Sequence, residues 1–132
     1  MKEYATPAIR NVAVVGHGGS GKTSLVDALA FVAGSSKRHG RIKEGSALTD
    51  YSPDEIEKAY SINLSLAFAE WENAKINLID TPGFLDFAGD AAAGIFAADA
   101  SLIVLSATAG VEVGTEKVYR QTRDFGHPAA LF

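Results

Sequence analysis

A short glycine-rich segment near the N-terminus carries residue types that can bind the phosphates of a nucleotide. Residues 16–23 read G-H-G-G-S-G-K-T and fit the pattern G-x-x-x-x-G-K-[ST] at every fixed position. Glycines let successive backbone N–H groups converge on an anion, and the start of a helix adds a positive dipole end. In such a loop Lys22 reaches the β- and γ-phosphates, and the hydroxyl of Thr23 binds Mg²⁺. Residues 9–15 predict a strand before the loop and residues 23–33 a helix after it, which favours this interpretation over an ordinary glycine-rich turn.

A second candidate phosphate site follows the apolar segment 75–79. There the chain reads D-T-P-G, which places Asp80 at the carboxyl end of an expected strand. In proteins with a phosphate-binding loop, a carboxylate in that position holds Mg²⁺, usually through water. Gly83 can turn its N–H toward a γ-phosphate and so report whether that phosphate is present. The alternative is an ordinary turn, but the order of the two motifs along the chain favours phosphate sensing.

Composition limits the classes of function open to the chain. A length of 132 residues fits one domain, and 47% hydrophobic with 21% charged residues is typical of globular proteins. The formal net charge of −4 provides no overall positive field for nucleic acid, so DNA is not an expected partner. The sequence has no cysteine, which excludes disulfides and cysteine-based metal sites. Because it shows no signal-peptide core and no long apolar run, we expect a cytoplasmic protein with no membrane partner.

Strand and helix patterns alternate along the rest of the chain. Strands are expected at residues 9–15, 62–68, 75–79 and 101–106 and after Pro128. Helices are expected at residues 23–33, 87–98 (with Asp86 as the N-cap) and 111–125. Glu72 and Asn73 predict a tight turn that pairs the second and third strands as an antiparallel hairpin. The sequence therefore predicts the α/β class: a mostly parallel sheet with helices on both faces, as in a P-loop NTPase.

Residues 34–60 have no clear periodicity. They begin with a basic cluster, made up of Lys37, Arg38, His39, Arg41 and Lys43, and then turn acidic. A long irregular segment in a compact domain is commonly either functional or disordered. Its charges alone fit a solvated face, and we expect His39 to face solvent.

The two motifs and the segment between them resemble the N-terminal GTPase domain of elongation factor G and its relatives. Residues 80–87 read D-T-P-G-F-L-D-F, close to the D-T-P-G-H-V-D-F of that family. Residues 50–62 align without a gap on its D-W-M-E-Q-E-Q-E-R-G-I-T-I. The resemblance continues through residues 107–121, so residues 1–132 are expected to form one GTPase domain.

The resemblance implies a role for each matching residue. Residues 34–61 would be switch I and residues 80–90 switch II, two loops that a γ-phosphate orders and its loss releases. The Mg²⁺ site would be formed by Thr23, Ser61 and, through water, Asp80. GTP or GDP would be bound by Gly16, His17, Gly18, Gly19, Ser20, Gly21, Lys22, Thr23, Ser24, Asp80, Thr81, Pro82 and Gly83. The protein would act on the ribosome in translation elongation.

The sequence departs from the family at the residues that would take part in GTP hydrolysis. The catalytic set would be Lys22, Gly83 and position 84, where the family has a histidine that orients the attacking water and this chain has Phe84. Phenylalanine has neither donor nor acceptor, so we expect slow intrinsic hydrolysis. Gly18 and Gly19 also replace larger family residues, and Gly18 opens space where the larger side chain of Phe84 arrives. A GTP-sensing module without hydrolysis, or a ribosomal protection-type paralogue, stays open as an alternative.

The motif with which GTPases read guanine, N-K-x-D after the fifth strand, does not occur before the last residue, Phe132. Guanine specificity is therefore inferred from the resemblance alone, and we expect a fragment truncated in its fifth strand. An uncovered sheet edge would then allow self-association. An ATP-using P-loop protein is a further alternative, which residues 80–83 and the match at switch I disfavour.

Overall fold

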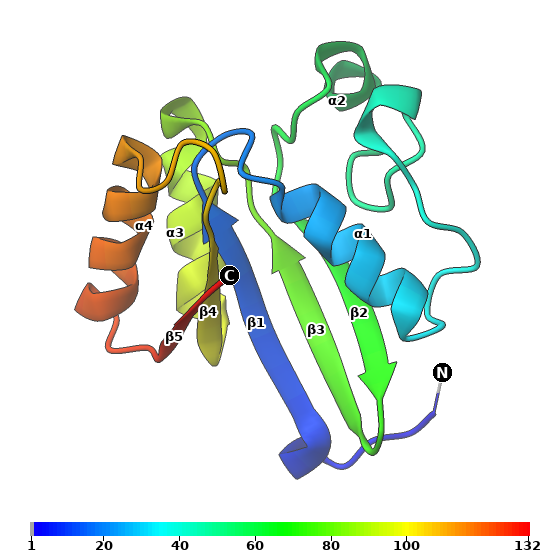
Figure 1. Cartoon of the computed structure of the whole chain (residues 1–132). Helices are drawn as coiled ribbons and strands as arrows, with labels where there is room; N and C mark the ends of the chain where they lie inside the picture. The colour runs from blue at the N-terminus through cyan, green and yellow to red at the C-terminus, as the bar shows by residue number, and fades with distance from the viewer. Residues whose placement is uncertain (1) are drawn as a thin grey trace.

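A five-stranded sheet with helices on both faces forms the centre of the structure (Figure 1), a computed structural model that describes residues 2–132. The strands are β1 (Ile9–Gly16), β2 (Ser65–Trp71), β3 (Ala74–Asp80), β4 (Ala100–Val104) and β5 (Ala129–Leu131). They are ordered β2-β3-β1-β4-β5, and the neighbouring strands are parallel except β2 and β3, which are antiparallel. The helices are α1 (Lys22–Val32), α2 (Pro53–Lys58), α3 (Ala88–Ala97) and α4 (Val113–Asp124), with 3₁₀ turns at Thr6–Ala8, Ile42–Glu44 and Leu85–Phe87. The predicted fold class is confirmed.

Two apolar cores, one on each face of the sheet, flank the central strand β1. Ala13 and Val15 pack with Ile95 of α3 on one face, whereas Val14 packs with Val26 of α1 on the other. A strand buried on both faces needs apolar residues at successive positions, which explains the continuous apolar run in this part of the sequence. Since β1, β3 and β4 are parallel, their carboxyl ends meet at one edge of the sheet, and both phosphate motifs leave the sheet there.

The second strand begins later than its alternating pattern predicts. β2 starts at Ser65 because the backbone N–H groups of Ile62 and Asn63 donate to Glu55 Oε1, at 3.0 and 3.1 Å, and not to a neighbouring strand. The strand then runs to Trp71 and pairs with β3 around the predicted turn. The antiparallel hairpin is therefore confirmed, with its start moved by a side-chain contact from switch I.

Asp86 is not the N-cap of the third helix, so that prediction was wrong. Residues Leu85–Phe87 form a 3₁₀ turn, in which the N–H of Phe87 donates to Phe84 O at 3.0 Å. The helix α3 begins after this turn, with Phe87 as its N-cap and no side-chain hydrogen bond to the cap. The turn inserted after the D-T-P-G motif carries Asp86 away from the start of the helix.

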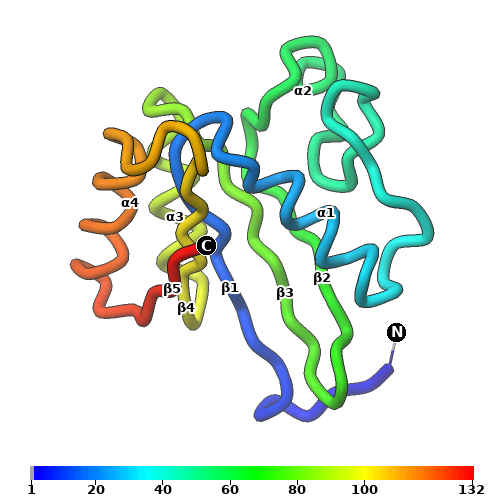
Figure 2. The backbone as a smooth tube through the Cα atoms, in the orientation of Figure 1, coloured from blue at the N-terminus to red at the C-terminus, as the bar shows by residue number. Residues whose placement is uncertain are grey.

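The irregular segment 34–60 contains a short helix that its periodicity did not predict. The six-residue α2 begins with a capping box, in which Ser52 Oγ accepts from Glu55 N and the Glu55 carboxylate accepts from Ser52 N. The signal was present in the sequence as S-x-x-E with Pro53 at the first helical position. Figure 2 shows this segment returning beside α1, so that α2 lies toward the end of the sheet where β1 and β3 end.

The edge strand β5 is exposed along its three residues and pairs with β4 alone among the described strands. Self-association through this edge stays a prediction. Among residues 2–132, no helix combines the length and apolar character needed to cross a membrane.

Two glycines of α3 offer a matched test of how this helix packs. A Cβ at Gly94 would lie 2.7 Å from Thr81 Cγ2, whereas one at Gly89 would meet nothing within 4 Å. Gly94→Ala should lower the free energy of unfolding by about 1–3 kcal/mol, since overpacking outweighs the better helix propensity of alanine. Gly89→Ala should leave stability unchanged or raise it by up to about 1 kcal/mol. Urea unfolding followed by circular dichroism measures both variants, and equal effects would contradict the close contact between α3 and switch II.

Candidate nucleotide-binding site

The phosphate loop connects the carboxyl end of β1 to the start of α1. Gly16, Gly19 and Gly21 have φ angles of 150°, 80° and 99°, which side chains other than glycine rarely adopt. At Gly16 an added Cβ would also collide with the carbonyl oxygen of Val104 in β4. The predicted strand–loop–helix context is therefore present, and α1 points its N-terminus at the loop.

Lys22 bends back over the loop that precedes it. Its Nζ donates to the carbonyl oxygens of His17 and Gly16, at 2.9 and 3.2 Å. The side chain is buried, and this burial lowers the pKa of Lys22 to about 8 against the opposing effect of Asp80 and Asp50. Gly83 of switch II lies against the same group, because a Cβ at Gly83 would collide with Lys22 Nζ. The two motifs therefore meet around one ammonium group.

A cluster of hydroxyls and carboxylates lies beside Lys22. Thr23 Oγ1 is 2.9 Å from Ser61 Oγ, and Ser61 in turn donates to Asp50 Oδ1 at 2.6 Å. Thr49 Oγ1 donates to Asp80 Oδ2 at 2.6 Å. The structure thus brings together the three predicted Mg²⁺ residues, Thr23, Ser61 and Asp80, and adds Thr49 and Asp50. Sequence reasoning missed these two, although Asp50 opens the segment that aligns with the elongation factor G family.

The second oxygen of each carboxylate in this cluster has no partner among the described residues. Asp80 Oδ1 and Asp50 Oδ2 are both buried without a hydrogen bond. Burial raises the pKa of Asp80 to about 6, although the hydrogen bond from Thr49 opposes the shift. Burial also raises the pKa of Asp50, with the hydrogen bond from Ser61 opposing. Unpaired carboxylate oxygens next to two hydroxyls are a suitable donor set for a hard divalent cation such as Mg²⁺.

A cavity of about 280 Å³ opens in front of the phosphate loop and this cluster. The predicted site residues that line it are Gly18, Gly19, Gly21, Lys22, Thr23, Ser24, Ser61, Gly83 and Phe84. Switch I closes one side with Ile42, Asp50, Ala59 and Tyr60. The cavity therefore lies between the loop and both switches, where a chain of phosphates would have to bind.

The remaining predicted residues lie behind the cavity wall. Thr81 Oγ1 donates to Val14 O at 2.8 Å, and Pro82 is fully buried, so both fix switch II to the sheet. His17 points away from the cavity: its Nδ1 accepts from Gly114 N at 3.3 Å, and its Nε2 is 3.5 Å from Glu112 Oε1. Ser20 Oγ is buried with no partner among the described residues. These side chains shape the loop, and any contact with a nucleotide would come from their backbone.

Phe84 fills the space that Gly18 leaves open. A Cβ at Gly18 would come within 3.2 Å of the Phe84 ring, and the ring of Tyr60 lies 4.7 Å away at an angle of 59°. The large side chain at position 84 therefore occupies the space that the missing side chain at position 18 leaves open, as expected. One corner of the cavity is consequently apolar and is formed by the phosphate loop and both switches.

The fold and this cavity define a P-loop nucleotide-binding domain of the α/β class. A glycine-rich loop leads into a helix N-terminus, a lysine lies across the loop, and a carboxylate follows the strand next to β1.

Residues 7–132 match the family described as the elongation factor Tu GTP binding domain, and the chain belongs to this family. It is 38% identical over 123 residues to an elongation factor G-like protein of Mycobacterium tuberculosis, an alignment that covers 93% of this chain. It is 36% identical over 132 residues to the mitochondrial ribosome-releasing factor 2 of Lodderomyces elongisporus, which covers the whole chain. A protein of Thermus thermophilus with a known crystal structure is 40% identical and superposes on 94% of this chain with a TM-score of 0.91.

These relatives are much longer than this chain. It spans 17% of the M. tuberculosis protein, 16% of the L. elongisporus protein and 19% of the T. thermophilus chain. The resemblance to elongation factor G-like GTPase domains is confirmed by sequence and by fold.

Ala59 provides a test of the switch I backbone at the cavity wall. It ends α2 in the left-handed region, at φ 55° and ψ 37°, where the elongation factor G family has glycine. Since this conformation costs an alanine about 1–2 kcal/mol, Ala59→Gly should raise the free energy of unfolding by about 0.5–1 kcal/mol after the entropy of glycine is counted. Ala33→Gly is the control. Ala33 ends α1 at φ −73°, where alanine is not strained, so the same substitution should lower the free energy of unfolding. Equal losses of stability in urea unfolding would contradict the strained backbone at Ala59.

Proposed function

We propose that the chain is a Mg²⁺-dependent GTP-binding domain of an elongation factor G-like protein that acts on the ribosome in translation elongation. The observation that carries the proposal is a pair of buried oxygens beside the loop lysine, Asp80 Oδ1 and Asp50 Oδ2, which have no hydrogen-bond partner within residues 2–132. Family membership supports guanine nucleotide as the ligand. The names of the relatives, an elongation factor G-like protein and a ribosome-releasing factor, support the ribosome as the partner.

The magnesium site in this proposal is held by Thr23, Ser61 and Asp80, with Asp80 acting through water. Asp50 and Thr49 hold Ser61 and Asp80 in place through the hydrogen bonds described above. Bound Mg²⁺ would neutralise negative charge that develops on the β- and γ-phosphates. The chain thus supplies the metal site from α1, β3 and two parts of switch I.

The phosphates would be bound by Lys22 and by backbone N–H groups of residues 19–23. To bind them, Lys22 exchanges its contacts with the two loop carbonyl oxygens for phosphate oxygens. Gly83 would direct its N–H at the γ-phosphate, so loss of that phosphate would release both switches. The guanine-reading motif is not within residues 1–132, and specificity for guanine is therefore proposed from the family alone.

Hydrolysis by this chain is proposed to be slow. Among the residues of the proposed catalytic set, Phe84 stands where the family places its water-orienting histidine, and its ring packs on Tyr60. Removal of such an orienting group costs about 10²–10⁴-fold in rate. The same apolar corner favours the second candidate function, a module that senses GTP without hydrolysing it; a ribosomal protection-type paralogue is the other alternative. The compartment we propose is the cytoplasm, although the ribosome-releasing factor 2 relatives are mitochondrial.

Binding is tested by calorimetric titration of the chain with GDP and with ADP, each with Mg²⁺. We expect weak binding of both nucleotides, because the phosphate cradle is present and the guanine-reading motif is not. Lys22→Ala should abolish the heat of binding, and Lys58→Ala, on the exposed side of α2, should leave it unchanged. Tight binding of GDP with ADP excluded would contradict this account of specificity. No binding to either nucleotide would contradict the proposed function.

Hydrolysis is tested by single-turnover assays with and without ribosomes. We expect slow turnover of GTP by the unmodified chain. Phe84→His should raise the ribosome-stimulated rate by about 10²-fold, since it restores a side chain that can orient water. Phe84→Leu keeps the corner apolar and should stay slow. Fast hydrolysis by the unmodified chain would contradict the proposal, and the absence of turnover under both conditions, with GTP still bound, would favour the sensing module.

A further inference from the structure

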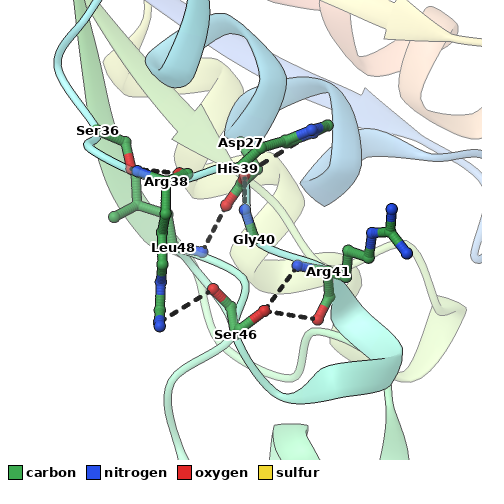
Figure 3. Close-up of polar contacts among 8 residues, drawn as sticks. All are labelled: Asp27, Ser36, Arg38, His39, Gly40, Arg41, Ser46 and Leu48. Atoms are coloured by element: carbon green, nitrogen blue, oxygen red, sulfur yellow. Dashed lines mark hydrogen bonds and ion pairs between the residues drawn. The ribbon is translucent and has the colours of Figure 1, made fainter.

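We propose that Asp27, a buried residue of α1 outside the phosphate motifs, is a positioning residue for switch I and through it for the magnesium site. The inference concerns residues 40–50 and rests on the proposed function only where Mg²⁺ is concerned. Figure 3 shows the Asp27 carboxylate between two points of the loop that follows α1.

Asp27 uses both of its carboxylate oxygens to hold this loop. Oδ2 accepts from the backbone N–H of Gly40 at 2.6 Å, and Oδ1 accepts from the backbone N–H of Leu48 at 2.9 Å (Figure 3). The residue is 1% exposed, so water does not compete for these oxygens. A carboxylate buried in a helix interior needs such partners, because an unpaired one is costly in a medium of low dielectric. The contacts therefore fix the loop to the helix at two positions.

The segment between these two positions closes on itself. The N–H of Arg41 donates to Ser46 Oγ at 2.9 Å, and the 3₁₀ turn Ile42–Glu44 fills the interval. Gly40 is necessary for the closure, because a Cβ at this position would collide with the carbonyl oxygen of Ser46. Asp27 thus holds both ends of a small closed loop, and loss of its carboxylate would free the loop as a unit.

The anchored end of this loop leads directly into the magnesium cluster. Leu48 precedes Thr49, whose hydroxyl donates to Asp80, and Asp50, which accepts from Ser61. Thr23 and Asp27 lie four residues apart in α1 and hence on one face of the helix, so α1 contacts switch I twice on that face. Thr23 meets Ser61 near the end of switch I, and Asp27 holds the part before Thr49.

His39 covers the Asp27 carboxylate from outside. Its side chain is 51% exposed, and its Nε2 lies 4.0 Å from Asp27 Oδ2. The ring stacks on Phe31 of α1, with centroids 5.6 Å apart and an angle of 17° between the planes. The expectation that His39 faces solvent is confirmed by its exposed side chain, and the face of the ring that is not exposed packs on Phe31.

The first test is amide hydrogen exchange of Asp27→Asn without nucleotide. In the unmodified chain each carboxylate oxygen of Asp27 accepts from one backbone N–H. The asparagine side chain has a single oxygen, and its NH₂ group cannot accept a hydrogen bond, so one of the two anchor bonds is lost. We expect at least tenfold faster exchange at Gly40 and Leu48 and at the adjoining Thr49 and Asp50, with β1 unchanged. Asp124→Asn, at the exposed end of α4, is the matched control and should change none of these amides. If the variant does not fold, Asp27→Glu, which keeps the charge but displaces the oxygens, should give the same pattern.

The second test separates positioning of the metal site from a general loss of binding. Affinity for a non-hydrolysable GTP analogue, which keeps the γ-phosphate, is measured with Mg²⁺ and with EDTA for both proteins. In the Asp27→Asn variant, the factor by which Mg²⁺ increases nucleotide affinity should be about tenfold smaller than in the unmodified chain. The affinity in EDTA, which depends on the phosphate loop, should be unchanged. Unchanged exchange at residues 40–50 would overturn the anchor, and an unchanged Mg²⁺ gain would overturn its role in the metal site. Absence of binding of the GTP analogue by the unmodified chain would overturn the proposed function instead, and hydrogen exchange would still decide the anchor.

Discussion

Burial of two carboxylates next to a buried lysine is the constraint on which the site depends. Asp80 and Asp50 are each at most 3% exposed, and each keeps one oxygen without a partner among the described residues. Their negative charges are tolerated there because Lys22 lies beside them and the hydroxyl groups of Thr49 and Ser61 donate hydrogen bonds to them. The same constraint ties together segments distant in sequence, since β3 supplies one carboxylate and switch I the other. A bound cation would balance the negative charge of the two carboxylates. The positions of the ends of α1 and β3 do not depend on such a cation, because the sheet fixes them.

The sequence was sufficient to predict those parts of the site that depend on regular structure. The phosphate loop and the D-T-P-G motif each follow a strand, and parallel strands carry their carboxyl ends to one edge. The complementarity of Gly18 and Phe84 was also predictable, because each departs from the family in a compensating direction. The contacts of Asp27 and Glu55 were not, since both bind backbone N–H groups whose positions follow from tertiary packing and from no sequence period. Asp86 failed as a cap for a related reason: a 3₁₀ turn shifted the start of the helix.

The cavity has two halves of different chemistry. The half formed by Lys22, Thr23 and Asp80 is polar and contains the groups proposed to bind phosphate and Mg²⁺. The half formed by Phe84 and Tyr60 is aromatic and offers no hydrogen bond from the ring of Phe84. In the proposed function, binding energy comes from the polar half, whereas the attacking water would have to be oriented at the aromatic half. A substitution confined to the aromatic half should therefore alter turnover more than affinity, which is why GTP sensing and slow hydrolysis are the two candidate functions.

Switch I is held by polar contacts and contributes little to either apolar core. Besides the contacts of Thr49 with Asp80 and of Ser61 with Thr23, it is fixed by the Asp27 contacts with Gly40 and Leu48 and by the Glu55 contacts with Ile62 and Asn63. Hydrogen bonds to a buried carboxylate are strong enough to order a loop, yet breaking them exposes little apolar surface. The loop can therefore leave the cavity without disturbing the packing of α1 on the sheet. An apolar anchor at the same positions would couple release of the loop to unfolding of the core. The polar anchors avoid that coupling, as the proposed response of switch I to one phosphate requires.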